Sequence, residues 1–169
     1  MNLSAWAVAL TGWGMMAANT LWAADKIPLT TPVSGVVEKV FVKPGQRVSK
    51  GTLLLQLDKT ILQARLDEAI AVQARAQAEE GDAKRDLDRA QELLDRTVSS
   101  TTELEAAALR HARAQATLAT ASARRVIAFK NLNDAELRAP FKGVVNAVPG
   151  APGTVVTAEC QPKTLVVMS

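Results

Sequence analysis

The chain has 169 residues, a formal net charge of +3 and one cysteine, Cys160. This length fits one or two small domains, and a lone cysteine excludes a disulfide framework and a CxxC metal or redox pair. Tyrosine is absent, phenylalanine occurs 3 times, and the basic residues form no tract. The sequence therefore predicts no nucleic-acid partner, because it offers neither a base-stacking platform nor a phosphate-binding stretch.

Residues 1–24 are predicted to export the chain. The stretch 2–24 carries no charged side chain and ends in Leu21-Trp22-Ala23-Ala24. This pattern is typical of a secretory signal peptide that is cleaved after Ala23 or Ala24. The stretch is also long enough to span a bilayer if it is not removed, so a retained N-terminal membrane anchor is the alternative. Both interpretations place the rest of the chain outside the cytoplasm.

Two β-rich segments, residues 25–57 and 137–169, resemble one another. Thr31-Pro32-Val33-Ser34-Gly35-Val36-Val37 in the first returns as Ala139-Pro140-Phe141-Lys142-Gly143-Val144-Val145 in the second. Short β-branched runs separated by Pro-Gly pairs at 44–45, 149–150 and 152–153 predict strands joined by type II turns. Each segment is too short to build a core alone. We therefore expect both to fold together as one small sandwich or flattened barrel.

Residues 58–136 lie between the two β segments and contain no proline. Apolar and alanine residues recur there with the a/d spacing of a coiled coil. The pattern breaks once, which predicts an antiparallel helical hairpin with its tip at about 97–102. Thr102 and Glu105 have the spacing of a capping box and indicate the start of the second helix. The predicted seam consists of Leu62, Leu66, Ala69, Gln73, Ala76, Glu80, Ala83, Leu87, Ala90, Leu94 and Thr97, facing Leu104, Ala107, His111, Ala114, Leu118, Ala121, Arg125, Ala128, Leu132 and Ala135.

This seam is rich in alanine, so the two arms approach closely but bury little apolar area. The first arm has an excess of acidic residues and the second an excess of basic ones, which favours pairing of the arms, although exposed ion pairs contribute only about 0–1 kcal/mol each. We expect neighbouring hairpins or a partner protein to complete this projection.

The chain re-enters the β module through the run Leu137-Arg138-Ala139-Pro140-Phe141-Lys142-Gly143-Val144-Val145. This run and the order of the three segments resemble those of the periplasmic adaptors of the membrane fusion protein (HlyD-like) family. The resemblance implies an α+β fold, in which a small β-sandwich (a biotinyl/lipoyl-like barrel-sandwich hybrid) is split by a long antiparallel α-helical coiled-coil hairpin. Family members usually continue into a β-barrel domain and a membrane-proximal domain. The sequence stops at Ser169, so we expect a minimal or truncated adaptor.

The same resemblance implies a function and partners. The chain would be a periplasmic, homo-oligomeric adaptor, with the anchor 2–24 holding it to the inner membrane if that stretch is retained. It would bridge an inner-membrane transporter and an outer-membrane efflux channel, with the transporter class (RND, ABC or MFS) left open. The role involves no enzyme activity, cofactor or metal.

A short motif near the tip resembles the one with which such adaptors dock on outer-membrane channels. Arg89, Leu93 and Ser100 have the family's spacing. The resemblance implies polar contacts from Arg89 and Ser100 and a packing contact from Leu93. Arg89 and Leu93 are one helical turn apart and so share a face. The alternative is that the first two are ordinary coiled-coil residues and Ser100 an ordinary loop residue.

Three other functions remain as alternatives. A biotin or lipoate carrier would modify Lys59, but that chemistry needs a lysine on a tight exposed turn, and a long helix is predicted to start there. An enzyme would rely on His111, the one histidine, which falls on the helical seam and lacks a recognisable partner set. A structural coiled-coil spacer differs from the adaptor only in having no channel at its tip.

Overall fold

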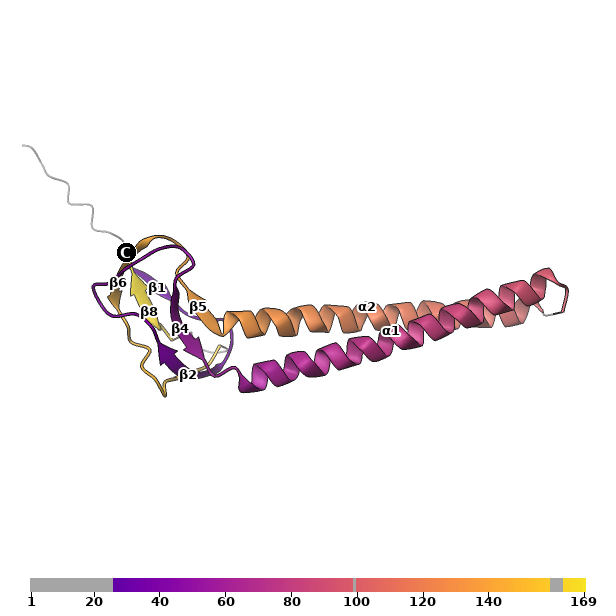
Figure 1. Cartoon of the computed structure of the whole chain (residues 1–169), viewed down its shortest axis with the longest axis horizontal. Coiled ribbons are helices and arrows are strands. Elements are labelled where there is room, and N and C mark those ends of the chain that lie inside the picture. The colour runs from indigo at the N-terminus through magenta and orange to yellow at the C-terminus, as the bar shows by residue number, and fades with distance from the viewer. Residues whose placement is uncertain (1–25, 99, 159–162) are drawn as a thin grey trace, which may run out of the picture.

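The computed structural model describes residues 26–98, 100–158 and 163–169. Figure 1 shows a β module at one end and a hairpin of two long helices that projects from it. The predicted signal or anchor segment, 1–24, lies outside the described residues. The arrangement confirms the predicted α+β fold, a small β-sandwich split by a helical hairpin.

Within the described residues, the β module consists of two four-stranded sheets in which every pair of neighbouring strands is antiparallel. One sheet has the order β1-β8-β6-β3 and the other β5-β4-β2-β7. Each sheet therefore takes strands from both β segments. The strands are β1 (Ile27–Leu29), β2 (Gly35–Val40), β3 (Arg47–Val48), β4 (Leu53–Leu57), β5 (Glu136–Arg138), β6 (Gly143–Ala147), β7 (Val155–Val156) and β8 (Val166–Met168).

The two copies of the repeat exchange strands with each other. Strand β2 of the first copy pairs with β7 of the second, and β6 of the second pairs with β3 of the first. The turns follow the same symmetry: the Gly45 amide donates to the Val145 carbonyl at 2.7 Å, and the Gly153 amide donates to the Val37 carbonyl at 2.8 Å. Neither copy can complete its hydrogen bonds alone, so the prediction of one module built from both segments is confirmed.

The core lies between the two sheets and draws on both segments. Its fully buried side chains include Leu55 and Leu57 from the first segment and Val145, Leu165 and Met168 from the second. A core shared in this way is the physical reason for the joint folding, since each half buries its apolar face only against the other.

The Pro-Gly turns fulfil the prediction at two of three positions. Gly45 and Gly153 have φ values of 84° and 85°, a region that glycine enters without a Cβ clash. Gly150 is not among the residues with positive φ, so the prediction was wrong there. That glycine is buried against Leu165, whose carbonyl accepts its amide at 3.0 Å, and a Cβ would lie 3.1 Å from the leucine side chain. Close packing, and not turn geometry, selects glycine at this position.

The hairpin consists of α1 (Thr60–Asp95, 36 residues) and α2 (Thr101–Asp134, 34 residues). At 1.5 Å per residue each helix is about 50 Å long. The burial follows the predicted seam closely: Leu62, Leu66, Ala76, Ala107 and Ala121 are buried. The other seam positions are half-buried, with three exceptions. Thr97 is exposed and Ala135 is fully buried, and both lie beyond the ends of their helices; Arg125, within α2, is exposed.

The insertion leaves and re-enters the β module at one point. Strands β4 and β5 are paired neighbours, and the Leu57 amide donates to the Ala135 carbonyl at 2.8 Å. Replacing residues 58–134 with an Asn-Gly turn should therefore leave a folded β module, because a two-residue turn suits antiparallel neighbours. Circular dichroism should show a β-rich, cooperatively melting protein. An additional Val145→Asp substitution, which places a charge in the core, should unfold it. A random-coil spectrum for the excised variant itself would show that the module needs the hairpin.

Candidate functional site

The tip of the hairpin is a tightly hydrogen-bonded connection. Helix α1 reaches its C-cap at Arg96, and Thr97 follows with a left-handed φ of 61°. The Thr97 amide donates to the Leu94 carbonyl at 2.8 Å, and the Val98 amide donates to the Leu93 carbonyl at 3.0 Å. These two bonds form a Schellman motif, which satisfies carbonyl groups that the end of a helix leaves without partners.

Helix α2 begins directly after this motif. Ser100 is its N-cap, with extended backbone, and its hydroxyl oxygen accepts a hydrogen bond from the Glu103 amide at 3.4 Å. The predicted start at Thr102 and Glu105 was therefore wrong by two residues. Ser100 and Glu103 have the same capping-box spacing, and serine is the better N-cap residue of the two.

The structure places the three predicted docking residues in two separate settings. Arg89 lies on the exposed side of α1, with its guanidinium 3.1 Å from the Asp86 carboxylate. Leu93, which is 38% exposed, lies one turn further toward the tip. Arg89 and Leu93 line the same shallow groove, whereas Ser100 caps α2 and is not part of the groove lining.

The groove has a volume of about 450 Å³ and is shared by the two helices. Glu103, Ala106 and Arg110 contribute its α2 side. Sequence reasoning missed Arg110, because only the register between the helices shows which α2 residues face Arg89. It also missed Val98, which is 74% exposed at the apex. An apolar residue at the break in the heptad pattern was the available signal for Val98.

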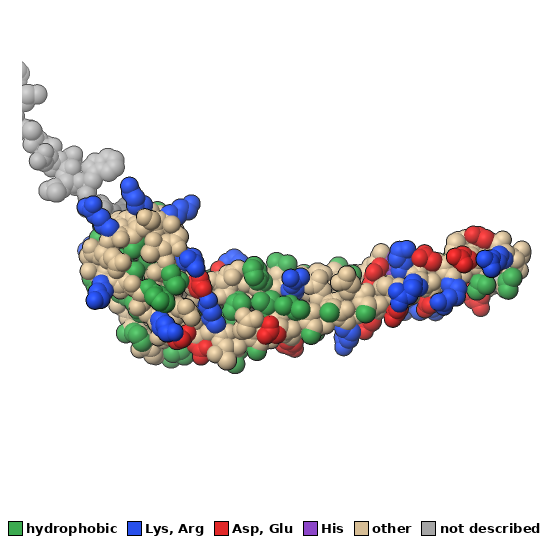
Figure 2. Space-filling view, viewed as in Figure 1, with side chains coloured by type: hydrophobic (Ala, Val, Ile, Leu, Met, Phe, Trp, Pro, Cys, Tyr) green, Lys and Arg blue, Asp and Glu red, His purple; other side chains and the backbone are tan. Residues whose placement is uncertain are grey.

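Charge is distributed unevenly along the hairpin. Arg75 is the single charged residue within 69–78 and 114–123. Figure 2 shows hydrophobic side chains over this inner part and crowded Lys, Arg, Asp and Glu toward the tip. The ion pairs of the outer part join residues of the same helix, for example Lys84 with Asp88 at 3.1 Å. The outer third is therefore a charged, solvated surface. The inner part has few charged side chains, so its apolar side chains face solvent with few charged neighbours.

The expected pairing of oppositely charged arms is mostly absent among the described residues. The contact across the seam is instead polar: the His111 Nε2 lies 2.9 Å from a Glu80 carboxylate oxygen, and Arg125 donates to the Gln73 side chain at 3.3 Å. His111 and Glu80 are both largely buried. His111 thus serves as a seam residue whose contact with Glu80 helps to fix the register of the two helices.

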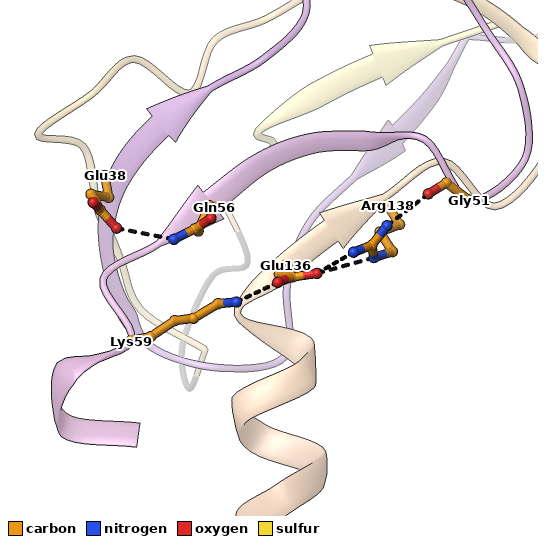
Figure 3. A network of polar contacts seen from close by, with 6 residues as sticks. All are labelled: Glu38, Gly51, Gln56, Lys59, Glu136 and Arg138. Carbon is orange, nitrogen blue, oxygen red and sulfur yellow. Dashed lines mark hydrogen bonds and ion pairs between the residues drawn. The ribbon is translucent and has the colours of Figure 1, made fainter. Parts of the chain in front are cut away.

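A second polar cluster holds the base of the hairpin (Figure 3). Lys59, which precedes α1, forms an ion pair with Glu136, which follows α2. Arg138 contacts the other oxygen of Glu136 through its Nε at 3.1 Å and donates to the Gly51 carbonyl at 3.0 Å. The hydrogen bond from Lys59, followed by that from Arg138, lowers the pKa of Glu136 below its usual value. This cluster ties the two ends of the insertion to the β module.

The environment of Lys59 is unlike that of a lysine that carries biotin or lipoate. Its side chain is half-buried and held by Glu136, and it occupies the N-cap position of α1. The Asp58 carboxylate beside it accepts hydrogen bonds from the amide and hydroxyl of Thr60, which lowers the pKa of Asp58. The lysine is therefore held by Glu136 at a helix start and does not stand free on a turn.

The described residues contain neither a metal-ligand cluster nor a membrane-spanning helix. Over 26–98, 100–158 and 163–169, no three His, Cys, Asp or Glu side chains come together as metal ligands. Neither of the helices in this part of the chain combines the length and the apolar character that a membrane span requires.

Comparison with known proteins matches nearly all of these residues. The family model of the CzcB-like, barrel-sandwich hybrid domain covers residues 26–165. The chain is 32% identical over 145 residues to the "Efflux pump periplasmic linker BepF" of Brucella suis, a match that covers 86% of this chain and 35% of that protein. The chain thus spans about a third of the length of that relative.

Solved structures with the same fold include a MacA-MexA chimeric protein that contains the Pseudomonas aeruginosa MexA α-hairpin domain. It has 26% sequence identity and a TM-score of 0.65, and the match covers 86% of this chain and 46% of that one. MacA from Actinobacillus actinomycetemcomitans matches with 25% identity and a TM-score of 0.58, over 85% of this chain and 48% of that one.

The cluster at the hairpin base predicts a pH-dependent contribution to stability. The folded-state pKa of Glu136 is depressed below its unfolded value of about 4.3, so its carboxylate stabilises the fold above that pH. The contribution is lost as the pH falls through the lower folded-state pKa. Glu136→Gln should therefore lower the free energy of unfolding by about 1 kcal/mol at pH 7, and the difference should shrink below pH about 4.

Urea unfolding at several pH values measures this effect. Glu38→Gln is the matched control, because the contacts of the Glu38 carboxylate, with Lys39 and with the Gln56 side chain, lie at the exposed surface of the module (Figure 3). The control should change stability by less than about 0.5 kcal/mol. Equal losses in the two variants at pH 7 would contradict a special role for the Lys59–Glu136 pair.

Proposed function

The chain belongs to the CzcB-like membrane fusion protein family of periplasmic adaptors, and from this premise we propose that it is the adaptor subunit of an envelope efflux system. In this role its β module lies toward an inner-membrane transporter, and its hairpin reaches an outer-membrane channel. The role is non-catalytic and takes place in the periplasm. The observation that carries the proposal is the projection of two paired helices, about 50 Å long. They project from a β module that both β segments of the chain build together.

The proposed docking site is the tip, where Arg89, Leu93 and Ser100 lie. Arg89 is exposed and its guanidinium can donate up to about five hydrogen bonds, of which the contact with Asp86 uses few. Leu93 adds an apolar contact at the edge of the groove. Together the two side chains offer a partner one polar and one apolar contact at the far end of the hairpin, and this combination supports docking over the spacer alternative.

A second part of the proposal is self-association through the base of the hairpin. Exposed apolar side chains there run from the β module onto the helices: Val36 and Val155 from the β2–β7 edge, Ile61 from α1 and Ile127 from α2. They line two hollows of about 710 and 270 Å³ that share Leu62, Arg65 and Asn131. We call this surface the junction face. A second copy of the chain is the proposed occupant.

The nearly uncharged inner part of the hairpin continues this junction face. Isolated exposed apolar residues are normal on a protein surface, but a continuous apolar surface marks an interaction site. Side-by-side packing of copies would cover the face and would leave the charged outer part, with its tip, exposed for a different partner. Self-association and docking then use separate parts of the same hairpin.

Substitutions at the tip test docking. Arg89→Asp reverses the local charge and Leu93→Ser removes the apolar contact, and both should abolish binding to the channel and efflux. Folding should be preserved, since aspartate within a helix costs only about 0.7 kcal/mol in propensity. Arg85→Asp is the matched control, because Arg85 is an exposed arginine on the same outer part of α1 but does not line the groove. Cross-linking to the channel and helicity by circular dichroism are the measurements. If both tip variants cross-link and export as well as the parent, the spacer alternative is favoured.

A charge on the junction face tests self-association. Ile61 is 64% exposed in the first turn of α1, and this turn contains no acidic residue. Ile61→Glu should dissociate the oligomer while leaving the helix as stable or slightly more stable, because a carboxylate is favourable at a helix N-terminus. Ala64→Glu adds the same charge in the next turn, away from both hollows, and should leave the mass unchanged. Sedimentation equilibrium measures the mass. A parent protein that is monomeric at high concentration would contradict the proposal.

A further inference from the structure

The apex of the hairpin presents an apolar pair of which the docking motif includes only one member, Leu93. Val98 is, at 74%, the most exposed of the large hydrophobic side chains in the described part of the chain. Its amide is bonded to the Leu93 carbonyl at 3.0 Å. In a Schellman motif, residues at these two positions commonly pack against each other. The motif therefore places Leu93 and Val98 where they can form one apolar projection, which we call the apex pair.

The backbone that presents this pair is strained. Thr97 adopts φ 61° between the C-cap and Val98, a left-handed conformation that glycine occupies at most such helix ends. For a β-branched residue this conformation is uncommon and unfavourable. Threonine is thus a poor choice for ending the helix. It restricts the backbone more than glycine would and so holds Val98 in one position.

A cation without an internal partner lies beside the apex pair. Arg110 lines, from α2, the same groove that Arg89 and Leu93 line from α1. Arg89 is paired with Asp86, but none of the hydrogen bonds or ion pairs among residues 26–98 and 100–158 involves the side chain of Arg110. Its guanidinium is therefore available for a carboxylate or for the carbonyl groups at the end of a partner helix.

We propose that the tip recognises its partner through the apex pair, Leu93 and Val98, together with Arg110, and that Thr97 holds this surface rigid. The inference rests on the proposed function and specifies the chemistry of its partner. That partner is a protein surface with an apolar recess for the apex pair and an acidic side chain, or free helix-end carbonyl groups, within reach of Arg110. Rigid presentation favours binding because less conformational freedom is lost when the complex forms.

Photo-cross-linking in whole cells locates the surface. A photoreactive amino acid is placed at position 92, an exposed position near the tip that no docking residue occupies, at 98 and, as a control, at 126, where Val126 is 66% exposed near the base of α2. Position 98 should capture the same outer-membrane channel as position 92, and position 126 should not. If position 92 captures the channel while position 98 captures nothing, or captures a second copy of this chain, the inference is overturned and the proposed function stands. If neither position captures a channel, the proposed function fails as well.

Affinity measurements with that channel, purified in detergent, test each residue of the full chain. Val98→Ser and Arg110→Glu should each weaken binding at least about tenfold, a change that corresponds to 1.4 kcal/mol. Val126→Ser and Arg113→Glu make the same changes outside the groove and should stay within about twofold. Arg110→Lys should retain part of the affinity, because it keeps the charge but loses the planar fork. Equal affinities for Arg110→Glu and Arg113→Glu would remove Arg110 from the surface.

The Thr97→Gly variant tests whether Thr97 holds the apex pair in place, separately from its effect on the stability of the fold. Glycine relieves the strain at positive φ, so the melting temperature should rise. Binding should nevertheless weaken several-fold, because the apex pair loses its fixed position. A merely structural role for Thr97 would move both quantities in the same direction. If the variant is more stable and binds as tightly as the parent, Thr97 does not hold the binding surface rigid.

Discussion

The antiparallel pairing of β4 with β5 is the constraint on which the rest of the molecule depends. These strands are neighbours in one sheet, yet the whole helical insertion lies between them in the chain. The insertion must therefore start and finish side by side, within the reach of one hydrogen bond between Leu57 and Ala135. Two antiparallel helices of nearly equal length meet this requirement. The hairpin shape of the insertion is thus a consequence of the pairing between β4 and β5.

The same constraint explains why polar contacts gather at the base of the hairpin. Lys59 and Glu136 flank the two helices and join the strand ends at the point of exit. Thr31, the buried polar residue of the described core, donates its hydroxyl proton to the Asp134 carbonyl at 2.6 Å. Both contacts fix the direction in which the hairpin leaves the module. They matter because the alanine-rich seam buries little apolar surface and holds the helices together only weakly along their length.

Most of the fold could be predicted from the sequence, because repeats and heptads are properties of sequence spacing. The matching segments around Val37 and Val145 predicted a shared module, and the heptad from Leu62 to Leu94 predicted the buried faces. The exchange of β3 and β7 between the copies could not be predicted, since a repeat does not reveal which copy supplies the neighbouring strand. Gly150 shows the same limit: its packing against Leu165 is a long-range contact that a local Pro-Gly pattern does not encode.

The tip shows where local spacing stops being informative. Arg89, Leu93 and Ser100 have a recognisable spacing, but only the register of the helices brings Arg110 opposite Arg89. That register is fixed at a distance, by the strand pair at the base and by polar seam contacts such as His111 with Glu80. If α2 were shifted by one turn, the sequence motif at the tip would be unchanged, but Arg110 would no longer line the groove. Partner recognition at the tip is in this sense a property of the whole hairpin, because the strand pairing some 50 Å away decides which side chains meet there.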